Sequence, residues 1–175
     1  MKWAEIQAKL PSEKTPEAKA VRSKLFDQFD PNGNGYLSLA EVDSGVRDVL
    51  GLEDVFHAKA AIMRAFEASK NVAKTKSKYG ADFVERSEFR LLLLYLAKYF
   101  ELWEMFEMVD TTGDKRINRA EFKKAIAHVE KWGVKVDNTD AEFDKIDGNK
   151  GGFILFEEFA DWGLKKHLHL EDDAE

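Results

Sequence analysis

The chain has 175 residues, 44% hydrophobic and 34% charged, a balance typical of a folded, helix-rich protein rather than a disordered one. It has no cysteine, which excludes disulfide bonds, thiol catalysis, cysteine-based zinc sites and palmitoylation of this chain. Residues 1–98 hold 16 Lys+Arg against 14 Asp+Glu, and residues 99–175 hold 11 against 19, which gives the net charge of −6. The first half therefore suits an acidic partner or an anionic membrane surface, and the second half suits cations. The alternative is two ordinary solvated surfaces.

The N-terminal segment predicts two helices. A short amphipathic helix ends at Pro11. Thr15 is the predicted N-cap of a second helix, with Pro16 at its first position. The apolar stripe expected on this second helix consists of Val21, Leu25, Phe26 and Phe29.

A twelve-residue stretch, DPNGNGYLSLAE, follows at residues 30–41 and is called loop one. Ca²⁺ prefers six to eight oxygen ligands, and a loop of this length supplies them from positions 1, 3, 5, 7, 9 and 12, with a sharp turn at position 6. Gly35 stands at the turn. The ligand positions hold Asp30, Asn32, Asn34, Tyr36 (through its carbonyl), Ser38 and Glu41. Loop one therefore predicts a calcium site, the alternative being an Asx-rich surface turn.

The helix after loop one is expected to begin at a Ser38–Glu41 capping box and to continue to Gly51. Its predicted apolar residues are Val42, Val46, Val49 and Leu50.

The second unit of the pattern, residues 77–88, is called loop two and lacks a ligand set. Its positions 1, 3 and 5 hold Ser77, Tyr79 and Ala81, and its turn position holds Asp82. A lysine-rich insertion before it disfavours a nearby dication, so we expect loop two to bind no metal and to pair structurally with loop one. These lysines are Lys70, Lys74, Lys76 and Lys78.

The longest apolar run, Phe89 to Leu96, is interrupted by Arg90. It is shorter than the roughly 20 residues that a bilayer requires, so it predicts a buried helix.

Residues 110–121, DTTGDKRINRAE, form loop three. Its predicted ligands are Asp110, Thr112, Asp114, Arg116 (carbonyl), Asn118 and Glu121. Three carboxylates are expected to gather there, which favours a cation. Lys115 replaces the turn glycine, at a cost of about 1–2 kcal/mol if its backbone is left-handed. The outgoing helix is expected over residues 119–132.

Residues 147–158, DGNKGGFILFEE, form loop four, preceded by a helix with a Thr139–Glu142 capping box. Its predicted ligands are Asp147, Asn149, Phe153 (carbonyl) and Glu158. Gly151 and Leu155 offer no side-chain oxygen at positions 5 and 9. Loop four is therefore a weaker calcium site or, alternatively, a structural partner of loop three.

The four loop-closing glutamates, Glu41, Glu88, Glu121 and Glu158, are spaced by 47, 33 and 37 residues. Repetition at this period indicates tandem structural units. The predicted fold is all-α, with four EF-hand helix–loop–helix units in two lobes, 1–98 and 99–175. The apolar residues at position 8 are expected to form short antiparallel ladders, first loop with second and third with fourth. These residues are Leu37, Val84, Ile117 and Ile154.

Phrases outside the loops resemble the calflagins, the flagellar calcium-binding proteins of trypanosomes. They are LPSEKTPEAKA (10–20), RAF (64–66), DFVERSEFRLLLLY (82–95), YFELWEMF (99–106), KWGVKV (131–136) and FEEFADW (156–162). The resemblance implies a calcium-responsive protein of the flagellar membrane whose third and fourth hands carry the functional sites. The expected location is intracellular, in the flagellum or at its membrane if the resemblance holds and otherwise in the cytoplasm. Calflagins begin with an acylated glycine–cysteine segment, whereas this chain begins Met1-Lys2-Trp3, so a trimmed form or a soluble relative is expected. By that resemblance the most important residues are Asp110, Asp114, Glu121, Asp147, Asn149 and Glu158.

Three functions remain open at this stage: a calcium sensor with an unidentified protein target, an adaptor for an anionic membrane surface contacted by the basic N-terminal half, and a passive buffer or structural subunit. An enzyme is not predicted, because the chain carries neither a phosphate loop nor a nucleophile elbow.

Overall fold

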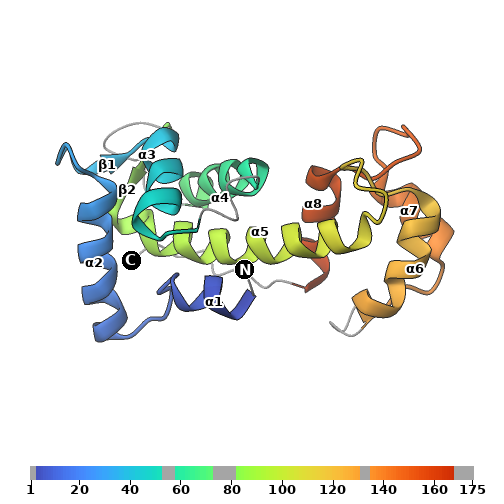
Figure 1. Ribbon diagram of the computed structural model, residues 1–175, viewed down its shortest axis with the longest axis horizontal. Helices are drawn as coiled ribbons and strands as arrows, with labels where there is room; N and C mark the ends of the chain where they lie inside the picture. Colours follow the sequence, from blue (N-terminus) through green and yellow to red (C-terminus); the bar gives the residue numbers. More distant parts are fainter. Residues whose placement is uncertain (1–2, 53–57, 73–81, 131–134, 168–175) are drawn as a thin grey trace. The chain divides into compact units, whose positions relative to one another are not determined.

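The computed structural model describes residues 3–52, 58–72, 82–130 and 135–167, and Figure 1 shows their helices and strands. The chain divides into two compact units, of which the first extends to Phe100 and the second begins at Glu101. The boundary predicted from the sequence follows Lys98, in the same helix as the division in the structure.

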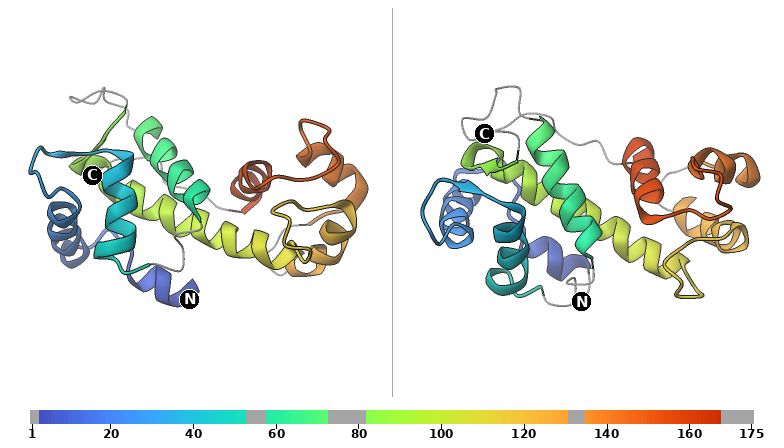
Figure 2. Two further views of the ribbon diagram at one scale, coloured as in Figure 1. Left: turned by 45° about the horizontal axis from the view of Figure 1, so that its top comes forward. Right: turned by 90° about the horizontal axis from the view of Figure 1, so that it is seen from above.

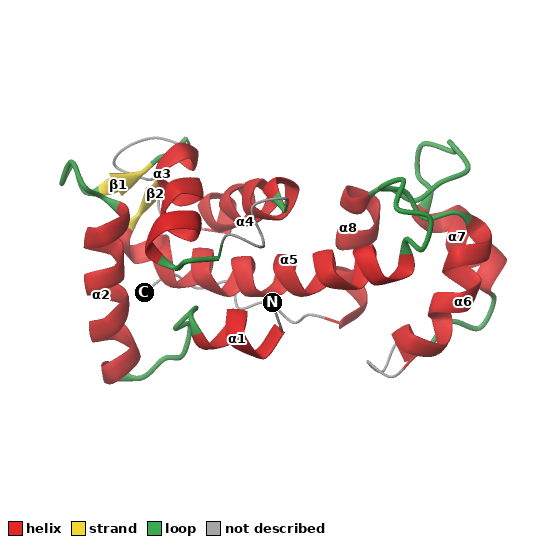
Figure 3. Cartoon of the chain, in the orientation of Figure 1, coloured by secondary structure: helices red, strands yellow, loops and turns green. Residues whose placement is uncertain are grey.

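Within its described residues, the first unit is helical apart from one two-stranded ladder (Figure 3). Its elements are α1 (Trp3–Ala8), α2 (Pro16–Phe29), β1 (Tyr36–Leu37), α3 (Leu39–Ser44), the π-helix η1 (Gly45–Val49), α4 (Lys59–Val72), β2 (Val84–Glu85), the 3₁₀-helix η3 (Arg86–Glu88) and the first part of α5 (Phe89–Val109).

Helix α2 begins as predicted, with the Thr15 hydroxyl accepting the Ala18 N–H at 3.1 Å and Pro16 at the first position. The predicted stripe is wrong at Val21, which is 54% exposed, whereas Arg22 is 2% exposed. Residue 22 lies three, four and seven positions before the buried Leu25, Phe26 and Phe29, so it shares their face of the helix. The Arg22 guanidinium donates to the carbonyls of Pro11 and Glu13, which satisfies part of its hydrogen-bonding need inside the unit.

The helix after loop one is not the single α-helix that the sequence predicts. It changes into the π-helix η1, in which Leu50 N–H donates to the Gly45 carbonyl at 2.9 Å. The helix approaches Phe29 so closely at Gly45 that an added Cβ would lie 2.4 Å from the ring. Val49 is 37% exposed rather than buried, and Gly51, with φ +64°, ends the helix as predicted.

The ladder of the first unit pairs β1 with β2 in antiparallel register, Leu37 opposite Val84 and Tyr36 opposite Glu85 (Figures 1 and 2). Leu37 and Val84 are both fully buried. The predicted pairing of the first loop with the second is confirmed.

The apolar run that begins at Phe89 is helical and buried, as predicted. Among the helices that the structure describes, none combines the length and the apolarity that crossing a membrane would require.

The second unit contains the end of α5 together with α6 (Arg119–Glu130), α7 (Thr139–Ile146) and α8 (Phe156–His167). Helix α6 lies beside α7 (Figure 2). Ile117 and Ile154 form an antiparallel bridge with N–H to carbonyl distances of 2.9 and 2.8 Å, which confirms the pairing of the third loop with the fourth. The predicted end of the α6 helix, residues 131–132, lies outside the described residues.

The capping box predicted before loop four is wrong. Asn138 is the N-cap of α7, and its side-chain oxygen accepts the Ala141 N–H at 3.0 Å, so Thr139 is already inside the helix. Glu142 instead accepts a hydrogen bond from Trp162 Nε1 at 2.7 Å and thereby links α7 to α8. Asn and Thr are both good N-caps, and the residue one position earlier is the one that the helix uses. The predicted fold class, all-α with paired helix–loop–helix units and short ladders, is confirmed.

Candidate calcium sites

Loops one, three and four are each organised around the aspartate at position 1. One oxygen of this carboxylate accepts the backbone N–H of position 6, at 2.9 Å from Gly35, 2.8 Å from Lys115 and 2.9 Å from Gly152. The other oxygen accepts an N–H from position 4 or 5. The three loops therefore share one backbone arrangement around a buried carboxylate. These aspartates are Asp30, Asp110 and Asp147, which are 6%, 7% and 6% exposed.

A glutamate at position 12 closes each of the three loops. One oxygen of its carboxylate accepts the backbone N–H of position 9, at 2.8 Å from Ser38, 2.9 Å from Asn118 and 2.9 Å from Leu155. In loop one the Ser38 hydroxyl oxygen in turn accepts the backbone N–H of Glu41. This reciprocal pair of hydrogen bonds confirms the predicted capping box. Because each carboxylate stands in the first turn of the outgoing helix, any ion that it binds is connected directly to that helix. The three residues are Glu41, Glu121 and Glu158.

Position 4 has a left-handed backbone in all three loops, a feature that the sequence did not lead us to predict. The φ angles there are +67° at Gly33, +72° at Gly113 and +55° at Lys150. The repeated glycine in loops one and three is the signal that could have revealed it. Position 6 is left-handed as predicted, with φ of +87°, +65° and +84° at Gly35, Lys115 and Gly152. Loops three and four therefore each hold one lysine in a conformation that is unfavourable for a side-chain-bearing residue, and loop one holds none.

Asp114, at position 5 of loop three, is turned toward an arginine. Its Oδ1 accepts the Arg116 N–H at 3.0 Å, and its Oδ2 lies 3.2 Å from a guanidinium nitrogen of Arg116. Desolvation acts to raise the pKa of the Asp114 carboxyl, but hydrogen bonds from Arg116 and Thr112 outweigh it and hold the pKa below its ordinary value.

The expectation that Asp110, Asp114 and Glu121 gather three carboxylates is wrong for the described arrangement. Over the residues that the structure describes, no three or more His, Cys, Asp or Glu side chains form a group able to hold a metal ion. Asp114 is instead paired with the Arg116 guanidinium.

Glu121 is also held ionised within loop three. Its Oε1 accepts the Thr112 N–H at 3.0 Å and its Oε2 the Asn118 N–H at 2.9 Å. Burial acts to raise the pKa of its carboxyl, but these bonds, with help from Thr111, lower it overall. Glu121 is thus ready to bind a cation without losing a proton at neutral pH.

Loop four has the same backbone with fewer oxygen-bearing side chains. Gly151, at position 5, contributes only its N–H, which donates to Asp147 at 3.1 Å and to the Asn149 side chain at 2.9 Å. Glu158 accepts the Asn149 N–H at 3.4 Å, a longer bond than the equivalent one from Thr112 to Glu121 in loop three, at 3.0 Å. That loop four is a weaker calcium site than loop three stays a prediction.

The first five residues of loop two, which include Ser77, Tyr79 and Ala81, lie outside the described residues. The prediction that loop two binds no metal therefore stays a prediction. Its closing residue, Glu88, is 1% exposed. Oε1 accepts the Glu85 N–H at 3.0 Å, whereas Oε2 has no hydrogen-bond partner among the described residues. Burial raises the pKa of the Glu88 carboxyl.

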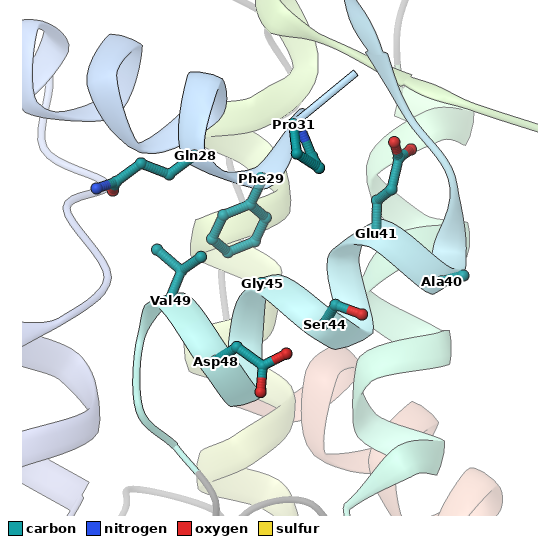
Figure 4. Close-up of a pocket in the computed structure, with 9 residues that line it drawn as sticks. All are labelled: Gln28, Phe29, Pro31, Ala40, Glu41, Ser44, Gly45, Asp48 and Val49. Atoms are coloured by element: carbon teal, nitrogen blue, oxygen red, sulfur yellow. The ribbon is translucent and has the colours of Figure 1, made fainter. Parts of the chain in front are cut away.

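A pocket of about 340 Å³ lies beside loop one, between the end of α2 and the turn from α3 into η1 (Figure 4). Phe29 and Val49 point toward one another across it, and the carboxylate of Glu41 points away from Phe29. Equivalent positions beside loop three line a smaller pocket of about 110 Å³ that includes Glu121. Each of these glutamates belongs both to a loop and to a pocket wall. The lining of the larger pocket is Gln28, Phe29, Pro31, Ala40, Glu41, Ser44, Gly45, Asp48 and Val49.

The chemistry of loops one and three fits a hard divalent cation, because their predicted ligands are oxygens of carboxylates, amides, hydroxyls and backbone carbonyls. A bound Ca²⁺ would supply the positive charge that pulls these oxygens onto one point.

Two family models match the chain, one described as the FCaBP EF-hand domain over residues 6–96 and one described as an EF-hand domain pair over residues 99–162. The flagellar calcium-binding protein of Trypanosoma cruzi is 38% identical over 175 residues, covering 99% of this chain and 83% of that protein. The chain belongs to the flagellar calcium-binding protein family. Flagellar calcium-binding protein TB-24 of Trypanosoma brucei brucei is 36% identical, with 99% and 80% of the two chains covered.

Membership of the flagellar calcium-binding protein family confirms three predictions: the EF-hand fold, Ca²⁺ as the bound ion, and the absence of an enzymatic role. The resemblance to calflagins is confirmed with them. A solved structure of a programmed cell death 6 protein homolog from Leishmania major Friedlin is 17% identical, covers 89% of this chain and 77% of that one, and has a TM-score of 0.45. At that score it adds nothing to the argument.

Proposed function

We propose that this protein is a calcium sensor, in which loops one and three bind Ca²⁺ and loop four is a weaker site. The observation that supports the proposal is that Glu41 and Glu121 each close a loop and also line an adjacent pocket. When Ca²⁺ draws such a carboxylate inward, the outgoing helix moves with it and the pocket changes shape. A passive buffer, the alternative role, would bind the ion without this consequence.

Calcium titration calorimetry on the wild type and on Glu41→Gln, Glu121→Gln and Glu158→Gln tests the site assignment. We expect each substitution to remove or weaken one site, because a neutral amide replaces the bidentate carboxylate. Glu157→Gln, an exposed neighbour of Glu158, is the matched control and should leave the titration unchanged. A site count that none of the three variants alters would contradict the assignment.

The sensor role needs a readout of shape as well as of uptake. Calcium should change the hydrodynamic radius and the binding of an apolar dye, and Glu41→Gln should suppress the part of the change that arises beside loop one. Full uptake of calcium with an unchanged radius and no new dye binding would establish the buffer instead.

We also propose that the protein acts in the flagellum at an anionic membrane surface. The names of its relatives support the first part. For the second part, Lys19 is an exposed basic residue at a small pocket of about 70 Å³. The other basic residues of this pocket are already engaged, Arg22 by the Pro11 and Glu13 carbonyls and Arg86 by Asp27. Lys70, the one lysine of the insertion that the structure describes, is instead engaged by Glu67 at 3.2 Å.

Vesicles with and without anionic lipid test the membrane proposal. Lys19→Glu should weaken binding to the anionic vesicles more than Lys24→Glu, which makes the same charge change on α2 outside the pocket. Raising the salt concentration should weaken binding by the wild type. Binding that ignores both the salt and the lipid charge would rule the proposal out.

A further inference from the structure

The side chain of Arg116 connects a predicted ligand of loop three to a predicted ligand of loop four. One guanidinium nitrogen lies 3.2 Å from Oδ2 of Asp114, the position-5 ligand of loop three. The same guanidinium stands 4.1 Å above the ring centroid of Phe153, the residue whose carbonyl is the position-7 ligand of loop four. The Ile117–Ile154 bridge, immediately adjacent, fixes the two loops in this register.

Arg116 itself is a position-7 residue, so only its carbonyl is expected to face the metal. Its side chain is therefore free for another role. Side-chain exposures of 47% for Arg116 and 34% for Asp114 mean that this ion pair is partly solvated and exchanges easily. An arginine over an aromatic face is attracted by the ring even when it has no anion beside it.

Calcium and Arg116 compete for the same carboxylate. An ion at loop three that took the Asp114 oxygen Oδ2 would replace the guanidinium as the partner of that oxygen. The guanidinium then loses its anion and keeps the Phe153 ring as a partner. Occupation of loop three is thereby transmitted to the residue that supplies a backbone ligand in loop four.

We propose that Arg116 is a positioning residue that couples calcium binding at the two loops: release from Asp114 strengthens its contact with Phe153 and makes loop four bind more tightly. The inference rests on the proposed function, since both loops must take up calcium. By linkage, occupation of loop four favours calcium at loop three by the same factor. Arg116 also lowers the affinity of loop three in isolation, because its pair with Asp114 must be broken.

Arg119 offers a matched control in the same loop. It also reaches hand four, donating to Asp140 Oδ1 at 3.0 Å and to Asp144, and it stands 4.4 Å from the Phe143 ring centroid. None of these partners is a predicted metal ligand. Removing its charge thus changes the electrostatics and the docking of α7 but leaves the ligand exchange intact.

Stepwise calcium-binding constants of the whole protein, measured for Arg116→Gln, Arg119→Gln and Phe153→Leu, test the coupling. In a Glu41→Gln, Glu158→Gln background, which leaves loop three as the one intact proposed site, Arg116→Gln should raise the affinity about two- to fivefold, the value of an exposed ion pair. With both loops intact, Arg116→Gln and Phe153→Leu should each reduce the cooperativity between them. The double variant should reduce it no further than either single one.

Nuclear magnetic resonance provides a readout that a purely structural role would not move. In the same Glu41→Gln, Glu158→Gln background, calcium at loop three should shift the Arg116 Nε–H signal and the Phe153 ring signals, and Arg116→Gln should abolish the ring shift. The inference is overturned if Arg119→Gln matches Arg116→Gln, or if loops three and four fill with unchanged coupling. If neither loop takes up calcium, the proposed function falls together with it.

Discussion

The two units join their loops at the same position with different chemistry. In the first unit the position-7 residues are both aromatic, and the rings of Tyr36 and Phe83 lie 4.6 Å apart. In the second unit the guanidinium of Arg116 covers Phe153 and also holds Asp114. Position 7 is expected to bind the metal through its carbonyl, so its side chain can contact the paired loop. We call this contact between two paired loops, together with the ladder beside it, the joint. One joint is neutral and the other carries a charge that a bound cation would disturb.

The joints also differ in extent. Two residue pairs form the ladder of the first unit, whereas a single bridge, Ile117 with Ile154, joins loops three and four. A longer ladder with uncharged side chains at position 7 suits a hand that only supports its neighbour, as expected of loop two. A shorter and charged joint suits two loops that respond to one another. The following substitutions challenge this contrast.

The largest effect is expected from truncating the buried residue at the centre of each joint. Leu37 and Ile117 are both fully buried, so Leu37→Ala and Ile117→Ala should each lower the free energy of unfolding of their own unit by about 2–5 kcal/mol. Hydrogen exchange, which reports on each unit separately, should show lost protection only in the unit that carries the substitution. Val21→Ala, at an exposed site, is the control. Loss of protection in both units at once would show that their stabilities are not separate.

A second test compares the residues that lie four positions after the closing glutamates of loops one and three. These residues are Gly45 and Ala125. Gly45→Ala places a Cβ 2.4 Å from the Phe29 ring and should destabilise the first unit by about 1–3 kcal/mol. Ala125→Gly, the reverse change in a regular helix, should cost only about 0.5–1 kcal/mol. Urea unfolding measures both. Equal costs would mean that the close approach of η1 to Phe29 is not a constraint.

The third test uses the buried carboxylate of loop two. Burial raises the pKa of the Glu88 carboxyl above its ordinary value of 4.5, so folding favours the protonated form of this acid over its charged form more than the unfolded chain does. Its contribution to stability is complete below the unfolded pKa and is lost as the pH rises through the folded pKa.

At neutral pH, Glu88→Gln should therefore raise the free energy of unfolding by about 1–3 kcal/mol and with it the unfolding temperature. The reason is that the position of Oε2, which has no hydrogen-bond partner among the described residues, no longer carries charge. The difference should shrink toward the acid end of a pH series measured with a chelator present. Exposed Glu157→Gln should show no such trend. A constant difference across the series would mean that Glu88 does not titrate with folding.

Local spacing allowed much of this molecule to be predicted. The ligand positions of loop one follow from residue types at fixed intervals, and the Ser38–Glu41 box follows from two residues three apart. Such patterns depend on nearby backbone alone, so they survive whatever packs around them. The pairing of Leu37 with Val84 was likewise predictable, because it follows from the repeat.

Features that depend on distant contacts could not be predicted. The helical pattern predicts a buried Val21, but Arg22 is buried instead. Its guanidinium donates hydrogen bonds to two carbonyls of the preceding loop, which makes its burial possible. The π-helix η1 arises where Gly45 meets Phe29, a contact that no local pattern contains. The sequence pattern assigns Arg116 a role only through its backbone carbonyl. The contact of its guanidinium with the Phe153 ring depends on the pairing of loops three and four.

The smallest effect is expected from the strained turns, and it separates backbone cost from ligand supply. Lys115, at φ +65° in loop three, and Lys150, at φ +55° in loop four, occupy left-handed positions that are both glycine in loop one. Lys115→Gly and Lys150→Gly should each stabilise the second unit by about 1 kcal/mol, because glycine adopts this conformation without a steric penalty. Lys115→Gly gains somewhat less, since it also removes a 3.2 Å pair with Glu107.

The reverse substitution, Gly35→Lys, should destabilise the first unit by about 1–2 kcal/mol. Thermal unfolding with a chelator measures all three variants, and calcium titration then shows whether relief of strain carries over into affinity. The calcium affinity of each loop should change little, because the folded protein already has the left-handed turn without the ion, so its cost is the same before and after binding. If the two lysine variants change stability but not affinity, the weakness of loop four lies in its missing oxygens at Gly151 and Leu155 rather than in its backbone.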